Sequence, residues 1–190
     1  SSLYFKIFLT YEDLHIIISD NGEGLFEHIS GQLKFKNYNI AAIEIAKGYV
    51  TTDPENHAGD ELKTVIHLFD KVTIDSAGRS LIFINKSKRW EINNSSQRKG
   101  TRIHLIINPN SNRTLKNTFN KLFSNEYKKM SIPISLITNT NARLINSRKK
   151  AQSLLRNIED LKEIEFDFNN IDLIGPAFAD ELVRKTKAKN

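Results

Sequence analysis

The sequence predicts an α/β protein made of two units, and three observations lead to this prediction. Short apolar segments rich in β-branched and aromatic residues recur along the chain, as they do in strands. Other segments repeat apolar residues every three or four positions, as amphipathic helices do. A polar break at residues 108–112 divides a larger first part from a smaller second part, in which strands and helices alternate.

The first part is predicted to hold two strands, then three helices, then three further strands. In chain order their ranges are 3–10, 14–19, 25–34, 40–47, 60–69, 71–76, 80–85 and 101–107. Gly48 ends the second helix, because glycine readily adopts the backbone conformation found after a helix. The polar segment 49–59 is predicted to be a mobile loop, and the polar segment 87–100 is predicted to be exposed.

The second part follows a helix predicted over residues 113–123. Its alternating strands and helices are predicted at 132–137, 147–158, 164–168 and 177–187, which is the pattern of βαβ packing. The domain organisation that we predict is therefore 1–110 for the first domain, 111–130 for a helical linker and 131–190 for the second domain.

Composition narrows the classes of function. The chain has no cysteine, which excludes disulfides, thiolate zinc sites and a cysteine nucleophile. It has no apolar run of membrane-spanning length and no signal-peptide pattern, so we expect a cytoplasmic protein without a membrane partner. The net charge of +6 allows binding of nucleic acid or nucleotide. A solvated basic surface explains this charge as well, and we prefer that interpretation.

The first group of residues with chemical potential is Asp20-x-Gly22-x-Gly24, directly after an apolar strand. An aspartate at a strand end can accept a hydrogen bond from an exocyclic amine such as that of adenine, and the glycines let the backbone pass close to a ligand. The same five residues are also typical of a plain turn between a strand and a helix. The motif gains specificity only from later segments of the chain.

Two later segments extend the motif. His57-Ala58-Gly59 opens the helix that contains Leu62, and a glycine before a helix leaves backbone N–H groups free to bind phosphate. Thr101 begins a late apolar strand, from which its hydroxyl could reach back toward a nucleotide. This order of elements is more specific than any one of them.

On these residues, the first part resembles the GHKL ATPase superfamily, which includes DNA gyrase, Hsp90 and histidine kinases. The resemblance implies an α/β sandwich. It implies that Asp20, Gly22 and Gly24 form the first glycine box, whose aspartate binds the adenine amine. The lid would be residues 49–58, the second glycine box would contact the phosphates through His57, Gly59 and Leu62, and Thr101 would lie near the adenine. ATP and Mg²⁺ are the implied cofactors.

The sequence departs from the GHKL pattern at its start. The superfamily's first motif is a helix carrying a glutamate that activates water or a hydroxyl and an asparagine that binds Mg²⁺. Only two residues precede the first strand here, so this helix does not fit and the sandwich is incomplete at its N-terminus. We therefore predict no catalytic residue in this chain. Nucleotide binding should be weakened or lost, and hydrolysis by this chain alone is not expected.

The second part contains the segment 166–181, which runs from Phe166-Asp167-Phe168 to Ile174-Gly175-Pro176 and ends on Asp180-Glu181. Residues 131–190 resemble a STAS-like domain of unknown function that is often fused to such ATPases in bacteria. In STAS anti-anti-sigma factors a serine at the start of the corresponding helix is phosphorylated. Pro176 and Ala177 stand there in this chain, so phosphotransfer at that position is chemically excluded.

The function that we predict is an ATP-binding regulatory or signalling protein of bacteria with a STAS-like output domain. A non-catalytic protein-interaction module with a vestigial nucleotide pocket is the alternative. A protein partner is expected in either case, and a homodimer is one form of it. Nucleic-acid binding is a third and weaker interpretation, resting on a missing upstream domain or on the basic segments around Lys88 and Lys99.

Overall fold

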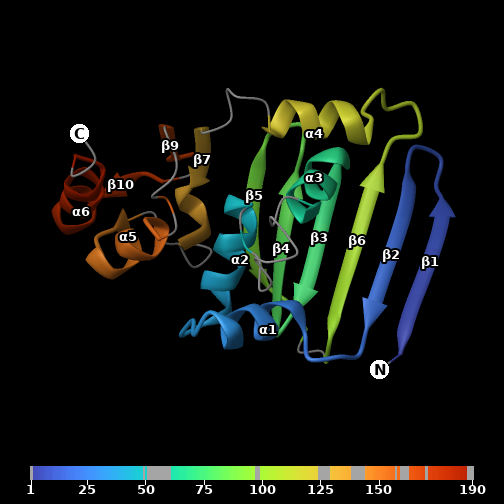
Figure 1. Ribbon diagram of the computed structural model, residues 1–190, viewed down its shortest axis with the longest axis horizontal. Coiled ribbons are helices and arrows are strands. Elements are labelled where there is room, and N and C mark those ends of the chain that lie inside the picture. Colours follow the sequence, from blue (N-terminus) through green and yellow to red (C-terminus); the bar gives the residue numbers. More distant parts are fainter. Residues whose placement is uncertain are drawn as a thin grey trace. The chain divides into compact units, whose positions relative to one another are not determined.

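The chain folds as a mixed α/β protein with two compact units, Ser1–Ser124 and Asn125–Asn190 (Figure 1). The α/β class is confirmed. The structure is a computed structural model, and it describes residues 2–48, 50, 61–96, 99–123, 129–137, 144–156, 158, 163–169 and 171–187.

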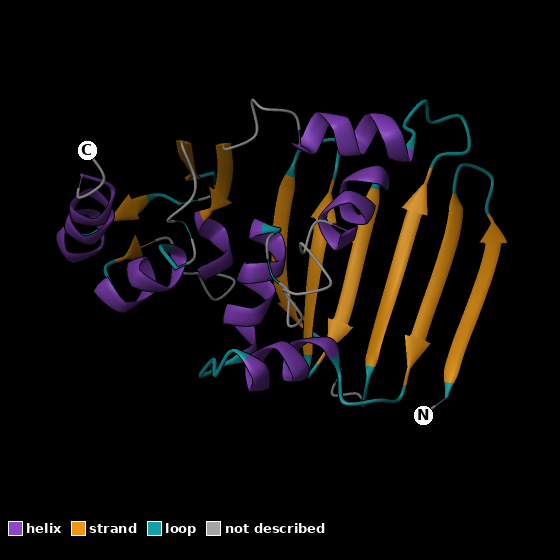
Figure 2. Cartoon of the chain, in the orientation of Figure 1, coloured by secondary structure: helices purple, strands orange, loops and turns teal. Residues whose placement is uncertain are grey.

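The first unit is built on one six-stranded antiparallel sheet (Figure 2). Its strands are β1 (Leu3–Leu9), β2 (Leu14–Asp20), β3 (Lys71–Ser76), β4 (Arg79–Ile84), β5 (Arg89–Asn94) and β6 (Thr101–Ile107). The strand order is β1-β2-β6-β3-β4-β5, and every neighbouring pair is antiparallel. Because β6 returns between β2 and β3, the start of β6 lies beside the end of β2.

Within its described residues this unit has four helices, and Figure 1 shows them in front of one face of the sheet around β3 to β5. They are α1 (Leu25–Gln32), α2 (Tyr38–Lys47), α3 (Glu61–Leu68) and α4 (Leu115–Phe123). Alternate residues of the strands face these helices, and Val72, Ile74 and Phe83 are at most 2% exposed there. Burial of these apolar side chains is the main source of stability for the unit.

The same face is uncovered at the other end of the sheet. β1 extends beyond the helices in Figure 1, and Leu3, Phe5, Ile7 and Leu9 are all more than half exposed. These four side chains point to the helix-covered side, because Ile7 pairs with Ile16, and Ile16 pairs with Leu105, which is in register with Val72. The apolar face of the sheet is thus wider than its helical cover.

Two of the expected elements differ from those observed in the structure. Residues 89–94, in the segment predicted to be polar and exposed, form β5, and Trp90 is buried against Phe83 with ring centroids 4.7 Å apart. Alternation explains the error, since the polar residues of β5 face away from the core. The strand predicted over 132–137 is confirmed only at residues 132–133. The strand ends at Pro133, which has no N–H for a ladder, and residues 134–137 form a 3₁₀ turn.

In the part of the second unit that the structure describes, there are two short parallel strand pairs and two α-helices. Its elements are β7 (Lys129–Pro133), η1 (Ile134–Ile137), β8 (Leu144–Ile145), α5 (Arg148–Leu154), β9 (Glu163–Asp167), β10 (Leu173–Ile174) and α6 (Pro176–Lys187). β7 pairs with β9, and β8 pairs with β10. Leu154 and Phe178 are fully buried in the α5–α6 packing of this unit. None of the helices that the structure describes is long and apolar enough to span a membrane.

Candidate functional site

The end of β2 and the start of β6 meet at the Asp20 carboxylate. Its Oδ1 accepts a hydrogen bond from Gly22 N at 2.7 Å, and its Oδ2 accepts one from Thr101 N at 3.2 Å. The cross-strand register pairs Ser19 with Arg102, which places Asp20 and Thr101 next to each other. The structure therefore brings Asp20 and Gly22 together with Thr101, which lies 81 positions after Asp20 in the sequence.

Gly100 makes this approach possible. Its φ of +80° is in the left-handed region that favours glycine. A Cβ at this position would lie 2.3 Å from the backbone oxygen of Asp20 and 2.7 Å from its Oδ1. Since both are too close for non-bonded atoms, any side chain at Gly100 would push β6 away from the end of β2.

The N-terminus of α1 is also bound to this region through hydroxyl groups. Leu25 N donates to Thr101 Oγ1 at 2.8 Å, and Phe26 N donates to Ser76 Oγ at 3.3 Å. Gly24 precedes the helix with a φ of +105°, and a Cβ there would lie 2.9 Å from Ser76 Oγ. Ser76 was not among the residues selected from the sequence. The only signal for it was a hydroxyl residue at the end of an apolar strand.

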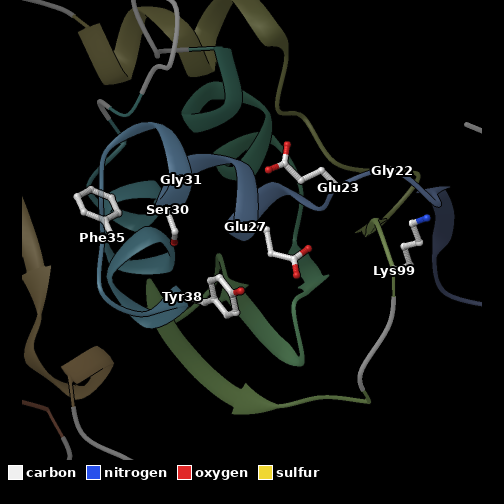
Figure 3. A pocket seen from close by; sticks show the side chains of 8 residues that line it. All are labelled: Gly22, Glu23, Glu27, Ser30, Gly31, Phe35, Tyr38 and Lys99. Carbon is white, nitrogen blue, oxygen red and sulfur yellow. The ribbon is translucent and has the colours of Figure 1, made fainter.

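A cavity of about 770 Å³ adjoins this cluster at Gly22. It is shown in Figure 3, where Phe35 lies at one end, Tyr38 lies beside Glu27 in the middle and Lys99 lies at the other end. It is lined by Gly22, Glu23, Glu27, Ser30, Gly31, Phe35, Tyr38 and Lys99. Asp20 and Thr101 do not line it, so the predicted adenine residues and this cavity share Gly22 alone. Its volume is in the range of small-molecule sites, roughly 300–1,000 Å³.

Two features of the cavity concern ligand chemistry. Glu23 and Glu27 both line it, and carboxylates repel the phosphates of a nucleotide. Glu23 is exposed and pairs with His28 at 3.1 Å. Ser30 is buried, and its Oγ has no hydrogen-bond partner within the described residues. The cavity therefore suits an uncharged or cationic group better than a triphosphate.

The predicted phosphate residues are only partly described. His57 and Gly59 lie outside the described residues, as does most of the predicted lid. Leu62 lies in the first turn of α3 and is partly buried. The assignments of Asp20, Gly22, Gly24, His57, Gly59, Leu62 and Thr101 to a nucleotide thus stay predictions.

Two basic residues of α3 have lowered pKa values. Burial lowers the pKa of Lys63 to about 8, and its side chain packs over Gly48 at the end of α2. Burial also lowers the pKa of His67 to about 4. This ring bonds to the backbone oxygen of Lys63 at 2.9 Å and lies against Phe83, with centroids 4.7 Å apart and planes tilted by 44°. A neutral His67 must donate from Nδ1, because the carbonyl can only accept. Sequence reasoning gave no sign of either shift.

The fit to the implied ligands can be tested on these contacts. Both oxygens of Asp20 accept hydrogen bonds from N–H groups, and an adenine amine is an N–H donor of the same kind. Mg²⁺ fits less well. Among the described residues, no group of three or more acidic or histidine side chains gathers to hold a metal ion. We therefore derive no chemical step through Mg²⁺.

In the second unit the acidic pair of α6 joins the two helices. Asp180 pairs with Arg148 at 2.9 Å, and Glu181 accepts hydrogen bonds from Gln152 at 3.2 Å and Arg184 at 2.8 Å. These bonds hold the pKa of the Glu181 carboxyl below its usual range. Asn146 Oδ1 accepts a hydrogen bond from Ala177 N at 3.3 Å at the start of α6, which ties the segment after β8 to this helix.

Comparison with known proteins supports the second unit only. Residues 150–190 match the family described as a STAS-like domain of unknown function (DUF4325). The match spans about a fifth of the chain and does not reach the six-stranded sheet. No curated protein and no solved structure shows significant similarity to the chain. The conclusion that the comparisons permit is a STAS-like segment at the C-terminal end of the sequence.

Proposed function

We propose that the first unit binds an adenine nucleotide at Asp20 and that the STAS-like unit transmits the bound state to a protein partner. In this proposal the first unit is of the GHKL type, and the protein acts in regulation or signalling. The observation that carries the proposal is the joint approach of Gly22 N and Thr101 N to one carboxylate. The GHKL resemblance assigns adenine recognition to these same three residues.

The geometry of the cluster supports an adenine in preference to a guanine. An aspartate carboxylate accepts hydrogen bonds but cannot donate them. Adenine carries an amine where guanine carries a carbonyl oxygen, and that oxygen would face the carboxylate without a proton between them. Because the cavity beside Gly22 contains Glu23 and Glu27, the phosphates would extend away from it.

The uncovered apolar face of β1 supports a further part of the proposal. A contiguous exposed apolar surface of this kind marks a site of interaction. In the GHKL superfamily the helix with the glutamate and asparagine comes before the strand that matches β1. We propose that a helix of this kind covers Leu3, Phe5, Ile7 and Leu9 in the functional protein and supplies the Mg²⁺ ligand and the general base.

A second candidate function rests on the same surface. If another protein covers the β1 face, the chain is a non-catalytic interaction module and its nucleotide pocket is vestigial. The exposed side chains of β1 favour this candidate directly, since they provide contact area without requiring any ligand. The two candidates differ in a single property, which is whether Asp20 binds a nucleotide.

Calorimetric titration separates them. ATP and GTP are titrated into the protein with and without Mg²⁺, and into the variants Asp20→Asn and Asp13→Asn. Asp13 lies just before β2 and Asp20 ends it, so the two variants make the same chemical change at opposite ends of one strand. We expect ATP to bind and GTP not to bind. Asp20→Asn should weaken ATP binding roughly tenfold to a hundredfold, because a charged hydrogen bond contributes about 1.5–3 kcal/mol.

The thermal midpoint of each variant is measured alongside, because Asp20 also holds Gly22 and Thr101 in place. Asparagine keeps one acceptor oxygen, so the Asp20→Asn variant can retain part of the local hydrogen bonding and stay folded. A folded variant that no longer binds ATP supports the proposal. Equal binding of ATP and GTP, or unchanged binding by Asp20→Asn, contradicts adenine recognition at this site. A longer form of the protein that contains the upstream helix and still binds no ATP would leave the interaction module as the function.

A further inference from the structure

The face of the sheet opposite the helices carries an unusual series of side chains. Thr73 lies between the buried residues Val72 and Ile74 and so points to this opposite face. The register of β3 with β6, β2 and β1 places His104, Ile17 and Lys6 in one row with Thr73. We call the part of this face formed by β1, β2, β6 and β3 the open face.

Aromatic and imidazole rings form a continuous run across three strands of the open face. Phe8 of β1 stacks on His15 of β2, with centroids 4.8 Å apart and planes 6° apart. His15 in turn contacts His104 of β6, with centroids 5.2 Å apart and a distance of 3.0 Å between Nδ1 and Nε2. Lys6 Nζ lies 4.8 Å from the Phe8 centroid, on the ring face.

The cations of the open face are not neutralised. Lys6, Lys71 and Arg102 form no ion pair among the described residues. Asp75 is the one carboxylate that the register places on this face, and it stands opposite Arg102. Lys71 and Arg102 also act on His104, whose pKa is lowered chiefly by burial and further by His15 and these two cations. The face is therefore positive as well as aromatic.

Tyr4 adds a freely accessible ring. It is 56% exposed, and two register steps on β1 separate it from Phe8. Four residues of strand span about 13 Å, at roughly 3.3 Å per residue. This separation leaves room for one base to stack on Tyr4 and another to stack on Phe8. Lys6 Nζ lies over the Phe8 ring, so a base that stacks there would displace this ammonium, which can then turn to a phosphate.

We propose that the open face binds single-stranded nucleic acid. Bases would stack on Tyr4 and Phe8, and Lys6, Lys71 and Arg102 would neutralise the backbone. The exposed Tyr4 ring and the partly exposed Phe8 ring alternate with cations that form no ion pair among the described residues. This combination matches the two requirements of single-strand binding, which are π-faces for bases and positive charge for phosphates. His15 Nε2 and His104 Nδ1 remain available to base edges, because the other nitrogen of each ring is used between them.

Duplex nucleic acid fits this surface less well. Its bases are stacked on each other and cannot reach Tyr4 or Phe8, so only the phosphate contacts would remain. The proposal is independent of adenine-nucleotide binding, because Asp20 takes part in neither the ring series nor the cation group. Its failure and that of the proposed function are therefore separate results.

The test is a fluorescence-anisotropy titration of labelled oligonucleotides of one mixed sequence, as single-stranded RNA, single-stranded DNA and duplex DNA, with heparin as a polyanion lacking bases. We expect both single strands to bind more tightly than the duplex or heparin. The RNA and DNA arms decide which of the two is preferred. With three phosphates neutralised, the slope of log K against log salt should be about −2 for a single strand.

Two pairs of variants identify the surface. Tyr4→Ala should weaken single-strand binding roughly tenfold, as loss of one stacked base does, whereas Phe5→Ala on the other face of β1 should have no effect. Lys71→Glu should weaken binding, and Lys116→Glu on α4 makes the same charge change away from the face. Circular dichroism and the thermal midpoint confirm that each variant is folded.

Three outcomes would overturn the proposal. The first is no anisotropy change at low salt with any oligonucleotide. The second is equal loss with Lys116→Glu and Lys71→Glu, which would assign binding to net charge. The third is unchanged binding by Tyr4→Ala together with equal affinity for heparin, which would exclude base stacking.

Discussion

Replacement of Gly100 by alanine tests the contact on which the candidate site depends. A Cβ at Gly100 would lie 2.3 Å from the backbone oxygen of Asp20 and 2.7 Å from the carbonyl carbon. Both atoms belong to a strand end held by the β2–β6 pairing, so they cannot rotate away as a flexible side chain can. The φ of +80° adds about 1–2 kcal/mol for any L-residue with a side chain.

The clash adds an overpacking cost of about 1–3 kcal/mol. Alanine also lowers the conformational entropy of the unfolded chain, which stabilises the folded state by about 0.4–1 kcal/mol. We therefore expect Gly100→Ala to lower the free energy of unfolding by about 1–5 kcal/mol. Urea unfolding followed by circular dichroism measures it. Gly31→Ala is the matched control. In the described part of the chain no atom lies within 4 Å of a Cβ at Gly31, and alanine in a helix gains up to about 1 kcal/mol. A loss for Gly100→Ala no larger than that for Gly31→Ala would refute this geometry.

Three further predictions concern stability. The pKa of His67 is lowered to about 4 in the folded protein, whereas the unfolded residue takes up a proton near pH 6.5. The free energy of unfolding should therefore be highest above about pH 6.5 and fall by roughly 3 kcal/mol as the pH drops toward 4. His67→Gln should flatten this pH dependence in urea titrations. Trp90→Ala should cost about 3–5 kcal/mol in the same assay, whereas Tyr11→Ala, fully exposed in the β1–β2 turn, should cost almost nothing. Glu181→Gln should lower the thermal midpoint because it removes the charged acceptor between α5 and α6, and Glu165→Gln on β9 serves as its exposed control.

Much of the fold could be predicted because local pattern and tertiary position agree. β2 reads as a strand from its run of isoleucines, and Gly48 at φ +81° ends α2 where the sequence places the end of a helix. Residues 89–94 were not predicted as a strand because their one large aromatic residue, Trp90, lies among mostly polar residues. A strand of that kind is recognised only when its partner, β4, is known.

In the candidate site, too, some residues could be predicted from the sequence and others could not. Asp20, Gly22 and Thr101 could be found because each belongs to a motif with a fixed place in the chain. Gly100 and Ser76 could not be singled out, since their importance comes from strand order, which brings β6 and β3 beside β2. The open face was also hidden, because Lys6, His15 and His104 are ordinary in sequence and become a group only across three strands.

The most direct test of adenine recognition is a ¹H–¹⁵N correlation spectrum of the labelled protein during titration with ATP. We expect the amide signals of Gly22 and Thr101 to move together and saturate at one ATP concentration, because both N–H groups bond to the carboxylate that would receive the adenine amine. Asp20→Asn should abolish these shifts. Saturable shifts that leave Gly22 and Thr101 unmoved would contradict adenine recognition by Asp20.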